Sequence, residues 1–347
     1  MAHDSRREDY QRLALRFART IDPNDPSAAR AFAGFGRRFA QEYDSLPQSD
    51  ADRAFHLVSL ANEVIDHRLP FSTEDQAPEL IRRGHALLDE AESLDPACFD
   101  AVRMKLSSQI ASLDARYQAL VDREPEVFAA CEKARDVEDP ADDDERRRLS
   151  RSLAMRPYWR WLATMAEAAL VCGRNRECVR VCEKLLASDK NDLSDVRFTL
   201  AYALAKLEDQ QGLDALLARY PRICPGRGAD DAWVILAQLT LAHRCCDLEA
   251  ARECLKRLSM VYPGAPDILL RQVELPDGEF ARLNVAPYSE DELVVALSEG
   301  TVLLQEGNDR TGRGVLGSWI IREATRMWPK AAARVAKEIA AEGGQAR

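Results

Sequence analysis

The chain has 347 residues, of which 46% are hydrophobic and 31% are charged. This composition is too apolar for a disordered chain and too charged for a membrane protein, so it predicts a folded globular protein. Its 58 acidic residues outnumber its 48 basic residues, and the net charge of -10 disfavours nucleic acid as a partner, because phosphate binding depends on an excess of Lys and Arg.

The first residues, MAHDSRREDYQRLALRF, mix charged and apolar side chains and lack the apolar core of a secretory signal. No window approaches the roughly 18 consecutive apolar residues of a membrane-spanning helix. The nine cysteines, an odd number without a secretory signal, are typical of reduced thiols. We therefore expect a cytoplasmic protein with neither a disulfide framework nor a membrane segment.

Ala, Leu, Arg and Glu dominate the chain, and apolar residues recur at spacings of three and four, whereas the alternation typical of strands is scarce. Residues that break helices, mainly Pro, Gly, Asn and Asp, gather at 22–26, 46–50, 69–78, 94–96, 139–144, 189–192, 220–228 and 262–266. The sequence predicts an all-α fold whose helices are roughly 12 to 25 residues long.

The acidic stretch 138–145 contains Pro140 and is the predicted domain boundary. It divides an N-terminal helical segment, 1–137, from a more regular helical array, 146–347. We interpret the stretch as a linker whose last carboxylates open a helix, where they favour the positive end of the helix dipole. The alternative interpretation is an acidic interaction tail.

The array repeats a spacing of small and apolar residues. The first unit has them at Leu162, Met165, Ala166, Ala169, Gly173, Cys178, Cys182 and Leu185, ahead of Lys190, Asn191 and Asp192. The second has them at Leu200, Ala201, Leu204, Leu213, Leu217 and Tyr220, and the third at Ala251, Leu255, Leu258 and Pro263. A partial repeat near 79–96 offers Gly84, Leu88, Ala91 and Pro96. Helix pairs with this pattern stack because each pair leaves an apolar face uncovered.

This spacing resembles that of the tetratricopeptide repeat. Residues 150–300, with the segments RPYWRWLATMAEAAL, NDLSDVRFTLAYAL, DDAWVILAQL and YPGAPDILL, also resemble the helical-repeat domain of suppressor-of-tumorigenicity-seven-like bacterial proteins. The resemblances imply a tetratricopeptide-like right-handed α-solenoid with an additional N-terminal helical segment, in a bacterial protein. They carry over no catalytic or binding residue.

Gly312, Gly314 and Gly317 spell GxGxxG, the spacing of a dinucleotide-binding loop. Such a loop follows a strand, whereas the preceding residues, 289–307, have a helical pattern. We interpret the glycines as the start of a helix and expect no nucleotide or other cofactor.

Cysteine and histidine are the residue types that bind zinc, and two groups of them stand out. One consists of Cys172, Cys178 and Cys182, and the other of His243, Cys245, Cys246 and Cys254. Neither contains a CxxC or HxxxH pair, and buried thiols often serve as small apolar groups. We expect no metal, and because the five histidines lie outside any recognisable catalytic motif we assign no catalytic residue.

Polar residues between the core positions of first helices tend to face the concave groove of such arrays. The residues expected to line a partner-binding groove are Arg156, Arg160, Glu167, Arg197, Tyr202, Lys206 and Gln238. The sequence thus predicts a noncatalytic scaffold or adaptor for a protein or peptide partner. The alternative is an enzyme, or an enzyme subunit, with an unrecognised site in the N-terminal helices or near Gly312.

Overall fold

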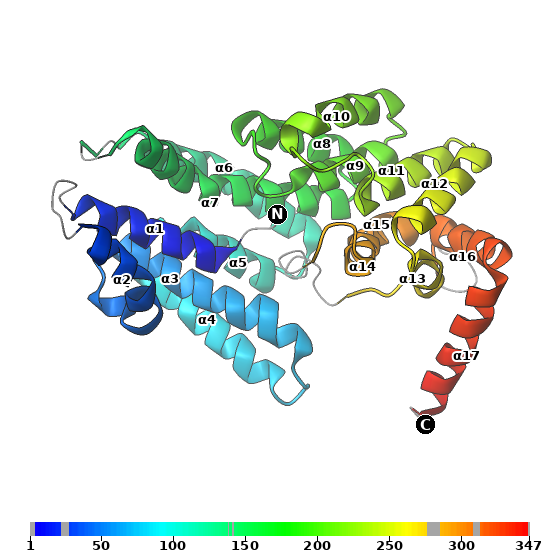
Figure 1. Ribbon diagram of the computed structural model, residues 1–347, viewed down its shortest axis with the longest axis horizontal. Helices are drawn as coiled ribbons and strands as arrows, with labels where there is room; N and C mark the ends of the chain where they lie inside the picture. Colours follow the sequence, from blue (N-terminus) through cyan, green and yellow to red (C-terminus); the bar gives the residue numbers. More distant parts are fainter. Residues whose placement is uncertain are drawn as a thin grey trace. The chain divides into compact units, whose positions relative to one another are not determined.

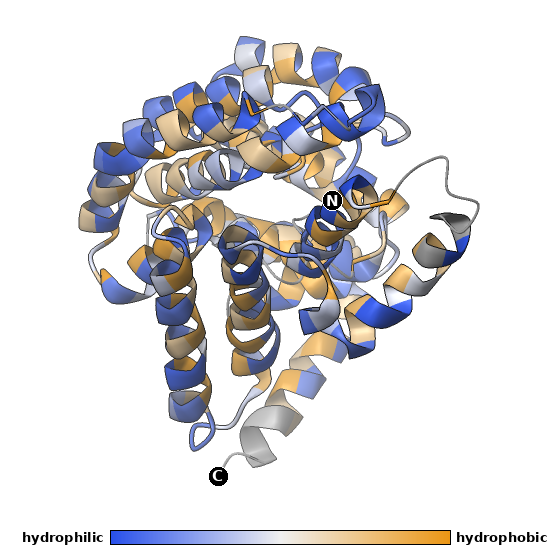
Figure 2. Ribbon diagram, turned by 90° about the vertical axis from the view of Figure 1, so that its left-hand side faces the viewer, coloured by the Kyte–Doolittle hydropathy of each residue, from blue (hydrophilic) through white to orange (hydrophobic). Residues whose placement is uncertain are grey.

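The computed structural model describes residues 4–21, 28–137, 139–140, 142–275, 285–307 and 313–345. Within these ranges the regular secondary structure consists of helices packed on helices, without a strand, which confirms the all-α prediction (Figure 1). Most helices present one hydrophobic and one hydrophilic face (Figure 2), as expected for helices at the surface of a globular protein. Among the described helices, none combines the length and the apolar character needed to cross a membrane.

The chain forms two compact units, an N-terminal unit, His3–Ala168, and a C-terminal unit, Ala169–Arg347. Their division lies inside a long helix, α7 (Asp144–Val171), and this corrects the boundary expected at 138–145. The acidic stretch is anchored instead of being a free linker, because the carboxylate of Asp142 is buried against the guanidinium of Arg19. Asp144 then begins α7.

The N-terminal unit is built from helices on either side of short 3-10 and π segments. These elements are α1 (Ser5–Arg19), α2 (Ala28–Gln41), η1 (Tyr43–Ser45), α3 (Asp50–Asn62), η2 (Glu63–Arg68), η3 (Leu69–Phe71), α4 (Ala77–Leu94), α5 (Phe99–Gln109), α6 (Leu113–Arg135) and most of α7. α3 packs against both α1 and α4, and α5 packs against α4 and α6.

The partial repeat near 79–96 lies on α4, where Gly84, Leu88 and Ala91 are buried. Leu88 and Ala91 join Ala54 and Val58 of α3 in one apolar cluster. The absence of a side chain at Gly84 has a steric explanation, since a Cβ atom there would lie 2.6 Å from the Cγ1 of Ile65 in η2. A larger residue at position 84 would therefore force the side chain of Ile65 to shift.

The C-terminal unit continues with short helices joined mostly by tight turns. They are α8 (Asn175–Ser188), α9 (Val196–Lys206), α10 (Gln210–Ile223), α11 (Ala232–Arg244), α12 (Leu248–Val261), α13 (Ala265–Arg271), α14 (Glu290–Glu299), α15 (Thr301–Leu304), α16 (Val315–Met327) and α17 (Pro329–Gln345). α9 contacts α8, α10 and α11, while α11 also contacts α12 and α14. α9 and α11 are buried on nearly every side, so they form the centre of the unit.

The same turn recurs at three helix ends. Gly173, Glu208 and Cys246 each adopt a left-handed backbone, with φ of 71°, 59° and 60°. In each turn the next N–H donates to the carbonyl five residues back, as Asp247 does to Ala242 at 2.9 Å. This pattern is the Schellman motif, which satisfies the last carbonyls of a helix.

The turns set the register of the helices that follow them. The turns end at Arg174, Asp209 and Asp247. Four positions later lie Cys178, Leu213 and Ala251, and eleven positions later lie Leu185, Tyr220 and Leu258. All six are fully buried, as the repeat spacing predicts. Leu217, placed in the core by the same spacing, is only partly buried.

Candidate functional site

A cleft of about 370 Å³ opens in the N-terminal unit between α1, the start of α3, the end of α6 and α7. Its apolar lining consists of Leu15, Ala51, Ala134, Val137, Leu153 and Ala154. Its polar lining consists of Arg12, Arg16, Arg19, Ser49, Asp52, Asp139 and Ser150. The cleft therefore combines an apolar surface with three guanidinium groups, all of them from α1.

The register of α1 brings the three arginines together. Arg12, Arg16 and Arg19 are spaced by four and three residues, and side chains at these spacings share one face of a helix. The helix begins at Ser5 because the side chain of Asp4 accepts a hydrogen bond from the N–H of Arg7, an N-terminal cap.

Carboxylates hold the arginines of the cleft in place. Arg16 forms an ion pair with Asp52 at 2.5 Å, and Arg19 forms one with Asp142 at 2.5 Å. Asp52 also closes the capping box of α3 by accepting from the backbone N–H of Ser49, so its position is fixed by the helix start. Paired in this way, the guanidiniums are ordered before any ligand arrives.

Arg12 is positioned by a proline in α7. Pro157 lacks an N–H and cannot donate to the carbonyl of Leu153, four residues earlier. That carbonyl accepts a hydrogen bond from Nη2 of Arg12 at 3.3 Å. The guanidinium of Arg12 also lies 4.2 Å from the ring centre of Phe55, a cation–π contact.

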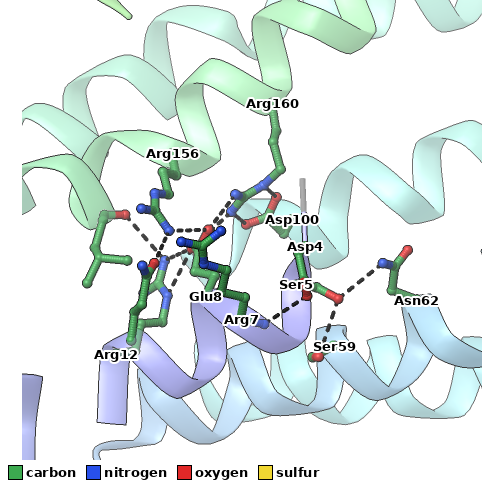
Figure 3. Close-up of polar contacts among 12 residues, drawn as sticks. Asp4, Ser5, Arg7, Glu8, Arg12, Ser59, Asn62, Asp100, Arg156 and Arg160 are labelled. Atoms are coloured by element: carbon green, nitrogen blue, oxygen red, sulfur yellow. Dashed lines mark hydrogen bonds and ion pairs between the residues drawn. The ribbon is translucent and has the colours of Figure 1, made fainter. Parts of the chain in front are cut away.

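An ion-paired centre adjoins the cleft and shares Arg12 with it. Figure 3 shows Arg12 of α1 and Arg156 and Arg160 of α7 pointing toward the buried carboxylate of Glu8. The distances to Glu8 are 2.8 Å from Arg12, 3.3 Å from Arg156 and 2.9 Å from Arg160. Arg160 also donates through Nε and Nη2 to the two oxygens of Asp100 on α5, at 2.6 and 2.5 Å. The centre thus ties α1, α5 and α7 together.

The pairing of Asp100 with Arg160 favours the charged form of both groups. Burial on its own would raise the pKa of Asp100, but the charge and hydrogen bonds of Arg160 outweigh it and hold that pKa below its usual value. Burial also opposes the charge of Arg160, yet Asp100 and Glu8 raise its pKa. The pKa of Arg156 is lowered, mainly by burial, and Arg160 and Arg12 lower it further. The carboxylates therefore offset the cost of burying the charge of Arg160, whereas they offset that cost only in part for Arg156.

The structure corrects the expectation that Arg160 faces an open groove, because the residue is only 6% exposed and is saturated by carboxylates. Arg156 is half-buried and donates to Glu8 and to the side chain of Gln11, at 2.8 Å for the latter. Glu167 is half-buried. Arg156 and Arg160 lie together in the ion-paired centre and contribute nothing to the lining of the cleft.

Arg197 and Tyr202 of α9 are each 2% exposed, so neither can line an open groove. Arg197 pairs with Asp192 at 2.7 Å and with Asp195 at 2.6 Å. The hydroxyl of Tyr202 donates to the carbonyl of Ala296 at 2.7 Å. Tyr202 thus joins α9 to α14, and Arg197 ties the start of α9 to the turn before it, so neither faces a partner.

The two remaining groove residues are also used internally. Lys206 donates to the carbonyl of Val302 at 2.9 Å, and its side chain is largely buried. Gln238 accepts a hydrogen bond from Arg257 at 2.8 Å. The repeat spacing correctly placed these polar side chains between core positions. Neighbouring helices cover them, however, so they form hydrogen bonds within the unit.

Two glycines of the GxGxxG motif, Gly314 and Gly317, lie in the described residues, and close packing explains both. Gly312 lies outside the described residues. A Cβ atom on Gly314 would overlap the carbonyl oxygen of Leu304, and one on Gly317 would lie 2.9 Å from that same oxygen. Gly314 precedes α16 and follows no strand in the described chain. Close backbone packing accounts for these two glycines.

The cysteines form no disulfide; all nine lie in the described ranges. Cys178 and Cys182 are fully buried with their Sγ atoms 3.9 Å apart. In the part of the chain that the structure describes, no three His, Cys, Asp or Glu side chains are grouped so as to hold a metal ion.

The sequence reasoning missed the arginines of α1. Their spacing was visible, since Arg12, Arg16 and Arg19 repeat at helical intervals. What the spacing could not reveal is the return of the chain past residue 139, which places Asp139 and Ser150 against the same helix.

Comparisons with protein-family models, with curated proteins and with solved structures found no match to this chain.

Proposed function

We propose that this protein is a noncatalytic interaction module that binds a segment of a partner protein in the arginine-lined cleft of its N-terminal unit. The observation that carries the proposal is the combination, in one cleft, of an apolar surface and three ordered guanidinium groups. The apolar part accepts a hydrophobic side chain, and the guanidiniums accept a neighbouring carboxylate. The bound segment is therefore apolar with an adjacent Asp or Glu.

Arg16 is the contact we assign to the carboxylate of the partner. Its side chain is 39% exposed, against 17% for Arg12 and 23% for Arg19. It is already oriented by Asp52 and by Ser49, whose Oγ accepts from it at 3.1 Å. An incoming carboxylate meets a guanidinium whose side-chain entropy has already been lost, which favours binding.

The lining of the cleft supports binding over catalysis. Among the described residues that form it there is no histidine, cysteine or lysine to act as a base or nucleophile. Its carboxylates, Asp52 and Asp139, are ion-paired with Arg16 and Arg19. Their oxygens serve to orient the arginines.

The finer proposals on architecture extend to the C-terminal unit. We propose that the helices joined by the turns at Gly173, Glu208 and Cys246 are tetratricopeptide-like units of a right-handed α-solenoid, in a bacterial cytoplasmic protein related to the suppressor-of-tumorigenicity-seven-like family. The recurring Schellman turn and the buried positions after it support the repeat.

A displayed peptide library tests the cleft. Ala134→Phe places a large side chain in its lining, whereas Ala129→Phe makes the same change on the same helix, α6, outside the cleft. Both positions are exposed, so each change should alter the free energy of unfolding by less than about 0.5 kcal/mol. The wild type and Ala129→Phe should select the same peptides with an apolar residue beside Asp or Glu, and Ala134→Phe should lose them.

Arg16→Gln gives the second arm of this experiment. It removes the guanidinium charge and keeps a polar side chain, so the selected peptides should lose their acidic residue and keep the apolar one. Retention of the same peptides by Ala134→Phe would exclude the cleft as the binding site. An unchanged acidic preference in Arg16→Gln would exclude the role we assign to Arg16.

A further inference from the structure

Two cysteines occupy adjacent positions in the turn between α11 and α12. Cys245 is the C-terminal capping residue of α11, Cys246 follows it, and both are exposed. The backbone of the turn is fixed by hydrogen bonds from the N–H of Cys245 to Leu241 at 2.9 Å and from the N–H of Cys246 to His243 at 3.1 Å. The turn thus holds two consecutive cysteines at the surface.

The turn itself does not require cysteine. At the equivalent left-handed position the other two turns have Gly173 and Glu208. An L-residue with a left-handed backbone costs about 1 to 2 kcal/mol relative to its right-handed conformation, so glycine is the residue best suited to the position. Neither backbone geometry nor burial explains the thiol of Cys246.

The other thiols are less available for reaction. Cys98, Cys131, Cys178 and Cys182 are buried. Burial raises the pKa of Cys98 to about 12 and that of Cys131 to about 11, which keeps both thiols protonated at neutral pH. Burial also raises the pKa of the half-buried Cys254. The exposed pair is therefore the dithiol that a reagent in solution meets first.

Adjacent cysteines suit a bridging atom better than a disulfide. Consecutive Cα atoms are about 3.8 Å apart, which is shorter than the roughly 4.4 to 6.8 Å that disulfides span. An atom inserted between the two sulfurs enlarges the ring that they close and relieves this constraint. Because the turn already fixes the backbone on both sides, little conformational entropy remains to be lost on bridging.

We propose that Cys245 and Cys246 form a dithiol site for thiophilic trivalent metalloid compounds, of which arsenic(III) is the representative. With an organoarsenic oxide, two arsenic–sulfur bonds form and the arsenic–oxygen bonding is broken. The oxygen leaves as water with the two thiol protons, and arsenic stays trivalent, so no oxidant or reductant is needed. This site is independent of the cleft in the N-terminal unit.

Phenylarsine oxide added to the reduced full-length protein tests the site. Intact mass and titration of the remaining thiols should show one arsenical bound and two thiols protected. A dithiol such as 2,3-dimercaptopropanol should release it, and a monothiol at equal concentration should not. Cys245→Ser and Cys246→Gly should each abolish binding.

The variants separate loss of the site from loss of the fold. Cys246→Gly supplies the residue that a left-handed backbone favours, so the turn and the helical circular-dichroism spectrum should be preserved. Cys224→Ser, at the half-buried end of α10, is the matched control and should bind like the wild type. Undiminished binding by Cys246→Gly, loss of binding in Cys224→Ser, or release by the monothiol would each overturn the proposal.

Discussion

Replacing Arg160 by methionine tests the ion-paired centre of the N-terminal unit. The change keeps much of the side-chain volume and removes the charge that faces Asp100 and Glu8. Glu8 would retain Arg12 and Arg156. Asp100 would lose both of its short hydrogen bonds while remaining buried, and would keep only the longer ion pair with Arg103, at 3.7 Å.

The cost of Arg160→Met follows from that imbalance. Removing one partner of a buried ion pair typically costs about 3 to 5 kcal/mol. That is a large part of the roughly 5 to 15 kcal/mol by which proteins are stable. Arg156→Met should cost only about 1 kcal/mol, because its removal also relieves the repulsion from Arg160 and Arg12 that lowers its pKa. A double variant, Arg160→Met with Asp100→Leu, should regain part of the lost stability, because the carboxylate that Arg160 paired with is then also removed.

Urea unfolding followed by circular dichroism gives the stabilities, and hydrogen exchange in α5 and α7 assigns the loss to the N-terminal unit. The expected order of stability is wild type, then Arg156→Met, then Arg160→Met. Equal midpoints for the two single variants would refute the reasoning. So would a double variant less stable than Arg160→Met.

The other predictions concern the C-terminal unit and are checked by urea midpoints. Burial raises the pKa of Asp192 to about 6, above the ordinary value of about 3.9. The contribution of Asp192 to the free energy of unfolding is therefore greatest at low pH and is lost as pH rises through 6. Asp192→Asn should lack this loss of stability with rising pH. Gly173→Ala should cost about 1 to 2 kcal/mol through its left-handed backbone, since a Cβ atom there meets nothing within 4 Å. Gly314→Ala should cost about 3 kcal/mol or more by overlap with the carbonyl of Leu304, and equal losses for both glycines would contradict this distinction. Ala251→Leu should cost about 1 to 3 kcal/mol because the residue is fully buried, whereas the same change at the exposed Ala218 should cost less than about 0.5 kcal/mol.

The helical character could be predicted because it depends on local spacing. Cys178 and Ala251 lie in the core where the repeat spacing placed them, since periodicity along a helix decides which face is buried. The domain boundary could not be found in this way. A run of acidic residues has the same composition whether it is solvated or, like Asp142, buried against an arginine.

The candidate site could not be predicted because its contacts join distant parts of the chain. Arg160 has the position of a groove residue on its own helix, but its partners Asp100 and Glu8 lie 60 and 152 residues away. A single sequence contains no local signal for such pairs. The turn at Cys246 is the opposite case, since its hydrogen bonds reach back at most five residues and its spacing from the next helix was visible.

The continuity of α7 limits how the protein can be divided. The helix runs from Asp144 to Val171, and the division between the compact units lies three residues before its end. A fragment that stops at Ala168 loses the last turn of the helix and the left-handed cap at Gly173. Fragments for separate study should therefore overlap, with the first ending beyond Arg174 and the second beginning before Asp143, whose side chain accepts from the N–H of Arg146 at the start of the helix. Each then carries a complete, capped copy of the shared helix.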